Sequence, residues 1–179
     1  MEKFYEVDIC NRKEKLPILT LPSGINIAFF NLHGNSDLTE YCGKLLAEKM
    51  TGCDVLITAE SKGLQLAHVC AREMNMPFYA VARKSKKLYM QDGISVSYGS
   101  SITTGVPQQL FLSKHDVDLI KGKKVGIIDD VISTGESLIG LTELVKKAGG
   151  IIYKKGFVLA EGDSKNRPDI EYLGVISLL

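Results

Sequence analysis

Two adjacent carboxylates, Asp129 and Asp130, are the side chains of this sequence best placed to do chemistry. They follow the apolar run 125–128 and precede two more apolar residues and a stretch of small, mostly hydroxylated ones. That stretch is Ser133, Thr134, Gly135, Glu136 and Ser137. Such residues predict a tight turn into a helix, where backbone N–H groups lack partners and the helix dipole favours an anion. The pattern therefore predicts a phosphate-binding turn beside a pair of acids.

The turn has room and donors for a single phosphate group. It lacks the lysine of the GxxxxGK[ST] loop, so the sequence does not offer a triphosphate site. Carboxylates close to a bound phosphate can accept hydrogen bonds from two sugar hydroxyls or hold a hydrated magnesium ion. The predicted ligand is a ribose 5-phosphate. The alternative is that the acids are solvated and the turn only caps a helix, but the run 125–137 taken together argues against it.

The elements that must position these residues alternate between extended and helical segments. Apolar runs and turn residues predict strands at 25–30, 54–58, 78–83, 123–130, 151–159 and 172–178, and helices at 35–50, 63–75 and from the turn to 148. This order predicts an α/β fold with a mainly parallel sheet covered by helices on both sides. Residues 85–107 are rich in Ser, Gly, Thr and Lys, and we expect a long hairpin or mobile loop there.

Length and composition exclude several classes of protein. The chain has 179 residues, 45% of them hydrophobic and 24% charged, which predicts one domain, 1–179, with its own core. The formal net charge is +1, so no overall field draws the chain to nucleic acid or acidic lipid. The charged start of the chain is not a secretory signal, and no apolar run could span a membrane, so we expect a cytoplasmic protein with reduced cysteines.

The run VGIIDDVISTGES closely resembles the diphosphoribosyl-pyrophosphate signature of type I phosphoribosyltransferases. The resemblance implies that family's fold, with a small hood formed by the terminal segments, and a homodimer. It implies transfer of ribosyl 5-phosphate from diphosphoribosyl pyrophosphate to a purine base, with Mg²⁺ as cofactor. Asp129 and Asp130 would bind the ribose and contact the metal indirectly, residues 133–137 would bind the 5-phosphate, and Val131 would lie against the base.

Two further segments resemble the adenine group of this family. TAESKGL at 58–64 resembles its pyrophosphate loop, usually ESRGF, which implies that Ser61, Lys62 and Gly63 contact pyrophosphate. RKSKKL at 83–88 resembles the RKxxKL segment, which adds Lys84 and Lys87 to that set. Taken alone, the second segment would be an ordinary solvated basic turn.

The resemblance implies adenine as the first candidate base, because ESKG, RKSKKL and the Tyr-Gly pair match the adenine group, with xanthine as the alternative. Tyr98 and Gly99 match the Tyr-Gly of the family's catalytic lid, so Tyr98 is a candidate catalytic residue, but Ser97 replaces the usual Glu before it. Xanthine phosphoribosyltransferases share the ARK-x-K run and the long hairpin. The effector domain of the Bacillus-type purine repressor also resembles the chain, so a non-catalytic sensor is the alternative class. We expect about 24 residues before the first strand, too few for that repressor's DNA-binding domain.

Overall fold

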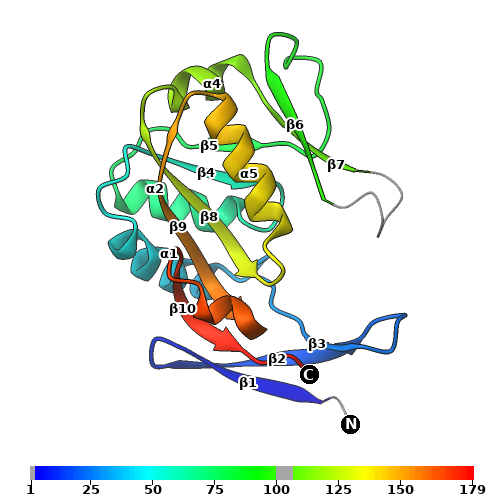
Figure 1. Cartoon of the computed structure of the whole chain (residues 1–179). Coiled ribbons are helices and arrows are strands. Elements are labelled where there is room, and N and C mark those ends of the chain that lie inside the picture. The colour runs from blue at the N-terminus through cyan, green and yellow to red at the C-terminus, as the bar shows by residue number, and fades with distance from the viewer. Residues whose placement is uncertain (1–2, 100–106) are drawn as a thin grey trace.

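The structure is a computed structural model that describes residues 3–99 and 107–179. Its centre is an eight-stranded sheet with the order β3-β2-β1-β10-β9-β8-β4-β5 (Figure 1). The strands are β1 Phe4–Ile9, β2 Arg12–Thr20, β3 Asn26–Ala28, β4 Val55–Ala59, β5 Ala80–Ala82, β8 Lys124–Ile132, β9 Ile151–Glu161 and β10 Glu171–Ile176. The strands from β10 to β5 are parallel to one another, which confirms the predicted sheet.

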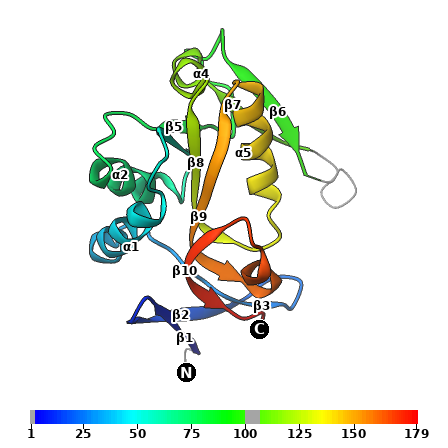
Figure 2. The same cartoon turned by 60° about the vertical axis from the view of Figure 1, so that its left-hand side comes forward.

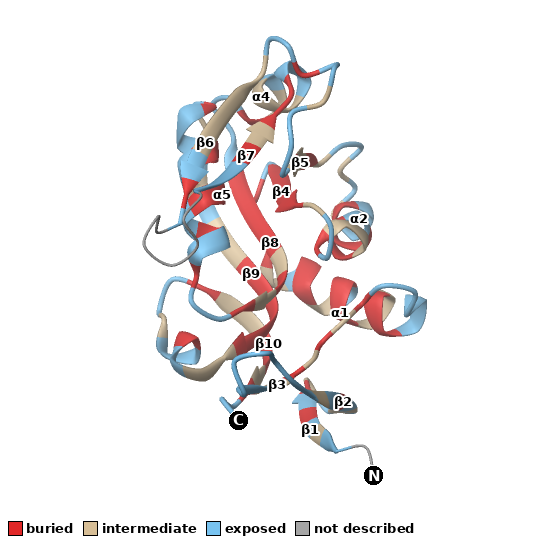
Figure 3. Cartoon of the chain, turned by 90° about the vertical axis from the view of Figure 1, so that its right-hand side faces the viewer, coloured by how far each residue is buried: buried red, intermediate tan, exposed pale blue. Residues whose placement is uncertain are grey.

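Helices cover both faces of this parallel sheet (Figure 2). Helices α1, Ser36–Lys49, and α2, Leu64–Glu73, pack on one face, and α5, Glu136–Lys147, packs on the other. Side chains alternate between the two layers along β4: Leu56 packs with α1 and α2, whereas Val55 and Ile57 pack with α5. Figure 3 shows that burial is concentrated in the central strands. Within the described ranges, no helix is both long and apolar enough to cross a bilayer.

The first helix begins where the sequence predicts. Asn35 caps α1, its Oδ1 accepting a hydrogen bond from the backbone N–H of Leu38 at 3.1 Å. Leu38, Cys42 and Leu46 form the buried stripe of the helix, because their spacing puts them on one face.

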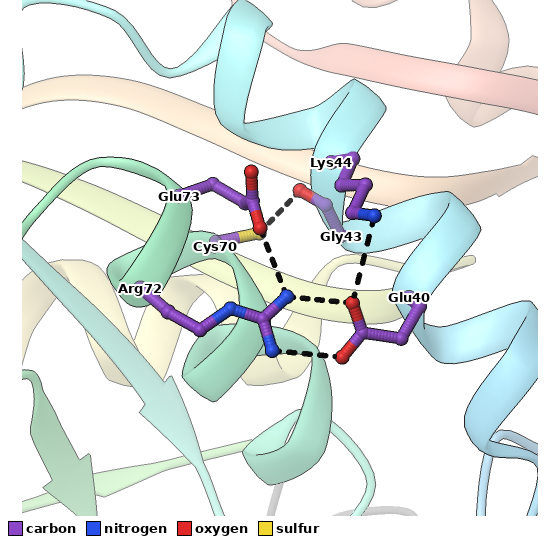
Figure 4. Close-up of polar contacts among 6 residues, drawn as sticks. All are labelled: Glu40, Gly43, Lys44, Cys70, Arg72 and Glu73. Carbon is purple, nitrogen blue, oxygen red and sulfur yellow. Dashed lines mark hydrogen bonds and ion pairs between the residues drawn. The ribbon is translucent and has the colours of Figure 1, made fainter.

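Helices α1 and α2 approach each other closely at Gly43. A Cβ atom there would lie 2.4 Å from Cγ1 of Val69, so no larger residue fits without displacing α2. Beside this contact Arg72 donates to both carboxylate oxygens of Glu40, at 2.9 and 2.6 Å (Figure 4). The Cys70 thiol donates to the Gly43 carbonyl oxygen. These contacts hold the C-terminal half of α2 against α1, away from the loop 60–63 that precedes α2.

The predicted hairpin is formed by β6, Ile94–Tyr98, and β7, Gln108–Leu112. The two strands pair antiparallel, with Tyr98 opposite Gln108, and contact α5. The part of the expected mobile loop at 100–106 lies outside the described residues.

The prediction that the first strand lies at 25–30 is wrong. Strands β1 and β2 precede it, and β1 pairs antiparallel with β10. Only Val7 and Ile9 of β1 are buried, Tyr5 is partly buried, and the exposed Phe4, Glu6 and Asp8 alternate with them, so the strand has only a short apolar pattern in a segment rich in charged residues.

One strand boundary and one helix also differ from prediction. Strand β8 continues past Asp130 to Ile132, because Val131 and Ile132 pair with β9. A short helix, α4 Lys114–Ile120, follows β7 and was not predicted. Its single buried residue, Ile120, leaves no helical pattern of apolar residues to detect.

Candidate active site

The paired acids lie near the carboxyl end of β8, the edge of a parallel sheet where ligands bind. The side chain of Asp130 is only 7% exposed, whereas Asp129 is partly exposed and lines the cleft. The backbone N–H of Asp130 donates to Oδ1 of Asp129 at 2.9 Å. Burial, together with the neighbouring Asp130 carboxylate, raises the pKa of Asp129. Two carboxylates held this close in a partly dry site favour a cation or hydroxyl donors beside them.

Lys62 supplies a cation to this pair. Its Nζ lies 3.4 Å from Oδ2 of Asp130 and 5.3 Å from the centre of the Phe29 ring. The same Oδ2 is buried and accepts no hydrogen bond from any described residue. The contact is thus an ion pair at a longer distance than a typical hydrogen bond, and the hydrogen-bonding capacity of this buried oxygen is unused among the described residues.

Gly63 allows the loop 60–63 to reach the aspartates. A Cβ atom at this position would lie 2.1 Å from Oγ1 of Thr58 and 3.1 Å from Oδ1 of Asp129. The loop is also tied to the end of β5, because the Glu60 carboxylate accepts from the backbone N–H of Lys84 at 2.6 Å. The loop and the basic segment that starts at 83 therefore sit together beside β8.

The predicted phosphate turn leads directly into α5. Gly135 precedes the helix with a φ of +83°, a conformation that favours glycine. The turn and the first residues of α5 line a cleft of about 200 Å³ that also includes Asp129 and Val131. Ser133, Thr134, Glu136 and Ser137 are all exposed. The turn thus lines the cleft with exposed hydroxyl side chains at the N-terminus of a helix, where a phosphate would be favoured.

A second cleft, of about 330 Å³, adjoins the first. It is lined by residues 59–62 and Lys84, and it shares Tyr98, Asp129, Val131 and Ser137 with the first cleft, whereas Gly63 lines neither of the two. The shared residues make one groove with the phosphate turn at one end and two lysines, Lys62 and Lys84, at the other.

Tyr98 lies at the junction of the two clefts but is only 7% exposed. Its hydroxyl donates to Oε1 of Gln108 at 2.7 Å, and its ring lies against Gly140 of α5, where a Cβ would come within 2.7 Å of the ring. Burial raises the pKa of this phenol. Tyr98 thus forms part of the wall of the groove, at the loop end of the paired strands β6 and β7.

Most of the predicted site residues meet in the groove. Ser61, Lys62 and Lys84 line the second cleft. Lys87 does not line either cleft, and its Nζ donates to Oγ of Ser85 at 2.7 Å. Glu136 lies with its carboxylate 3.8 Å from the position of a Cβ on Gly99, so it faces the hairpin rather than pointing away along the helix as a repelled acid should.

Two neighbours of the groove carry no signal in the sequence. Phe29 lies over Lys62, and the guanidinium of Arg167 lies against Gly135. Both contacts join residues more than thirty positions apart, so no local spacing could have revealed them.

The phosphoribosyl transferase domain family matches residues 33–177. A xanthine phosphoribosyltransferase of Exiguobacterium sp. is 35% identical over 140 residues, 74% of this chain and 71% of that protein. An adenine phosphoribosyltransferase of Methanococcus maripaludis is 27% identical over 169 residues, 93% of this chain and 86% of that protein.

Solved structures agree on the fold. The adenine phosphoribosyltransferase of Thermoanaerobacter pseudethanolicus superposes with a TM-score of 0.72 at 22% identity, covering 91% of this chain and 95% of that one. That of Rhodothermus marinus gives a TM-score of 0.69 at 23% identity, covering 90% and 94%. The family match over residues 33–177 and the 35% identity to the Exiguobacterium protein show that the chain belongs to the type I phosphoribosyltransferase family.

Proposed function

We propose that this chain transfers ribosyl 5-phosphate from diphosphoribosyl pyrophosphate to a free purine base, with adenine as the first candidate, and releases pyrophosphate. The observation that carries the proposal is the groove itself. A phosphate turn, a pair of acids and two lysines lie along it in the order in which the 5-phosphate, the ribose and the diphosphate follow one another in that substrate.

The reaction needs charge stabilisation more than it needs a nucleophile. As the bond from C1 of ribose to the diphosphate breaks, positive charge grows on the sugar ring and negative charge grows on the leaving group. Lys62 and Lys84 stand at the end of the groove where the leaving group would lie. Fixed cations in that place lower the barrier because they need no reorientation as the charge develops.

The two aspartates hold the ribose. Asp129 and Asp130 accept hydrogen bonds from its two hydroxyls, and Lys62 passes from Asp130 to the diphosphate when the substrate binds. The turn 133–137 binds the 5-phosphate as a remote handle, which aligns C1 with the base.

The donor set also suits Mg²⁺, a hard cation that prefers carboxylate and water oxygens. Residues 3–99 and 107–179 contain no cluster of three or more acidic, His or Cys side chains, so the ion would be held by the substrate, water and the two aspartates. When bound, Mg²⁺ would supply Lewis-acid stabilisation of the diphosphate.

Tyr98 and Val131 complete the site. Val131 lines both clefts and offers an apolar surface for a purine ring. The buried Tyr98 ring closes the wall of the groove next to the acids and keeps water from reacting with the sugar cation.

Adenine is placed first because ESKG, RKSKKL and the Tyr98–Gly99 pair match the adenine group, and the Methanococcus maripaludis adenine enzyme aligns over 93% of this chain. Xanthine is the second candidate, supported by the higher identity of that relative, 35%.

Pyrophosphate release tests the proposal. The protein is incubated with diphosphoribosyl pyrophosphate, Mg²⁺ and one base at a time: adenine, xanthine, hypoxanthine or guanine. Release with adenine alone supports the first candidate, and release with xanthine alone supports the second. Tight binding of the sugar diphosphate, with no pyrophosphate released in the presence of any of the bases, would contradict catalysis and favour a sensor.

A further inference from the structure

Arg167 places a cation against the phosphate turn. Its Nε and Nη2 donate to the two carboxylate oxygens of Asp169, each at 3.1 Å. The remaining nitrogen, Nη1, faces Gly135, where a Cβ atom would lie only 2.9 Å from it. Nη1 donates no hydrogen bond to any residue that the structure describes. The position that a side chain at 135 would occupy is therefore filled by a guanidinium from a distant segment.

Neighbouring contacts hold that guanidinium in place. Lys155 donates to Oδ2 of Asp169 at 2.6 Å, and the hydrogen bonds from Arg167 and Lys155 hold the pKa of Asp169 well below its usual range. The short helix η1, Gly162–Asn166, comes just before Arg167. Its buried Ser164 donates to the carbonyl oxygen of Ile132 at 2.9 Å, which anchors the segment to the end of β8.

The charge of this cluster complements the turn. Residues 131–137 include no Lys or Arg but do include Glu136, and Asp129 and Asp130 come just before them. Arg167 and Lys155 with Asp169 leave one net positive charge beside the turn. An anion at the turn is attracted by the partial positive charges of backbone amides and repelled by three nearby carboxylates. A fixed cation beside the turn offsets this repulsion.

We propose that Arg167 is a positioning residue for the sugar phosphate: held by Asp169, it supports the turn at Gly135 and supplies the positive charge that the turn itself lacks. This inference rests on the proposed function, because it assumes that the turn binds the 5-phosphate. Arg167 does not line the cleft, so it acts through Gly135 and through its field rather than by direct contact.

The test compares the wild type with Arg167→Gln and Arg167→Lys. Calorimetry measures the Kd of ribose 5-phosphate and, separately, of inorganic pyrophosphate, at two or more salt concentrations. We expect Arg167→Gln to weaken ribose 5-phosphate binding roughly five- to tenfold, with a shallower dependence on salt. Arg167→Lys should recover part of the loss, and pyrophosphate binding should stay within about twofold of wild type.

Arg72→Gln serves as the matched control, because Arg72 also pairs with carboxylates but lies between α1 and α2. It should leave both affinities unchanged. If Arg167→Gln binds ribose 5-phosphate as tightly as wild type, or weakens both ligands equally without rescue by Lys, the inference is overturned and the proposed function stands. If the wild type itself binds no ribose 5-phosphate, both the proposed function and the inference are contradicted.

Discussion

Among single residues, Asp130 combines an unusual environment with a proposed role in binding the ribose. Its buried Oδ2 lies 3.4 Å from the Lys62 ammonium and accepts no hydrogen bond from a described residue. A buried carboxylate with only one weakly held partner lowers the stability of a protein. Such a group is retained where a ligand supplies the missing hydrogen bonds.

We therefore expect Asp130→Asn to weaken binding of the sugar diphosphate about 10- to 100-fold, the effect of losing one charge-assisted hydrogen bond. Its melting temperature should be equal to or above that of wild type, because the substitution also removes the repulsion with Asp129. Calorimetric titration and thermal unfolding measure the two effects. Asp118→Asn, on exposed α4, is the control and should change neither. Unchanged affinity in Asp130→Asn would contradict the role given to this carboxylate.

Asp169 gives the pH dependence of stability a definite sign. Its pKa is lowered by Arg167 and Lys155, so its stabilising contribution is present above the ordinary carboxyl pKa, about 4, and is lost as the pH falls through its folded value. Between pH 5 and 8, Asp169→Asn should unfold at a lower urea concentration than wild type, because it loses the stabilisation of roughly one partly exposed ion pair. The two urea midpoints should begin to approach each other as the pH falls below about 4, and they should meet only below the lowered folded pKa of Asp169. A difference that does not depend on pH would show that packing, not charge, is responsible.

At the scale of elements, the loop 60–63 depends on a glycine that nothing larger can replace. In Gly63→Ala the new Cβ would meet Thr58 Oγ1 at 2.1 Å and Asp129 Oδ1 at 3.1 Å, so the loop must move away from β8.

We expect Gly63→Ala to cost about 1 to 3 kcal/mol of stability and most of the pyrophosphate affinity. The double variant Thr58→Ala with Gly63→Ala should regain part of both, because it removes the closer clash. Gly43→Ala is the control: its Cβ would clash with Val69, away from the groove, so it should lose stability but keep the affinity of the folded protein. Urea unfolding and calorimetry with pyrophosphate make the comparison. Full pyrophosphate affinity in Gly63→Ala would contradict the assigned position of the loop.

The elements that could be predicted from the sequence are those with a local signature. The spacing of Leu38, Cys42 and Leu46 identifies α1, and the run of apolar residues before Asp129 identifies β8. Strand β1 could not be predicted, because it buries only Val7 and Ile9 and is stabilised by pairing with β10, more than 160 residues away. Arg167 was missed for the same reason, since only the folded sheet brings it to Gly135.

At the scale of the whole molecule, the groove joins segments from distant parts of the chain. The loop 60–63, the strand β8 and the turn before α5 meet only when the parallel sheet is complete. A ligand that contacts all of them must stabilise the fold as a unit.

Diphosphoribosyl pyrophosphate at about one hundred times its Kd should therefore raise the melting temperature by roughly 5 to 10 °C in the presence of Mg²⁺. Ribose 5-phosphate and pyrophosphate should each raise it as well, because each occupies one end of the groove. Ribose without a phosphate is the control and should give no measurable shift at the same concentration. Equal shifts with ribose and with the diphosphate would contradict the role of the phosphate turn.

A crystal structure of the protein with adenosine monophosphate would show whether the turn 133–137 and the two aspartates bind a nucleotide. The phosphate should lie on the backbone amides of residues 133–137, the ribose hydroxyls should be within hydrogen-bond distance of Asp129 and Asp130, and the purine should lie against Val131. A nucleotide bound elsewhere, or density that leaves the turn empty while the nucleotide is present at saturating concentration, would contradict the account.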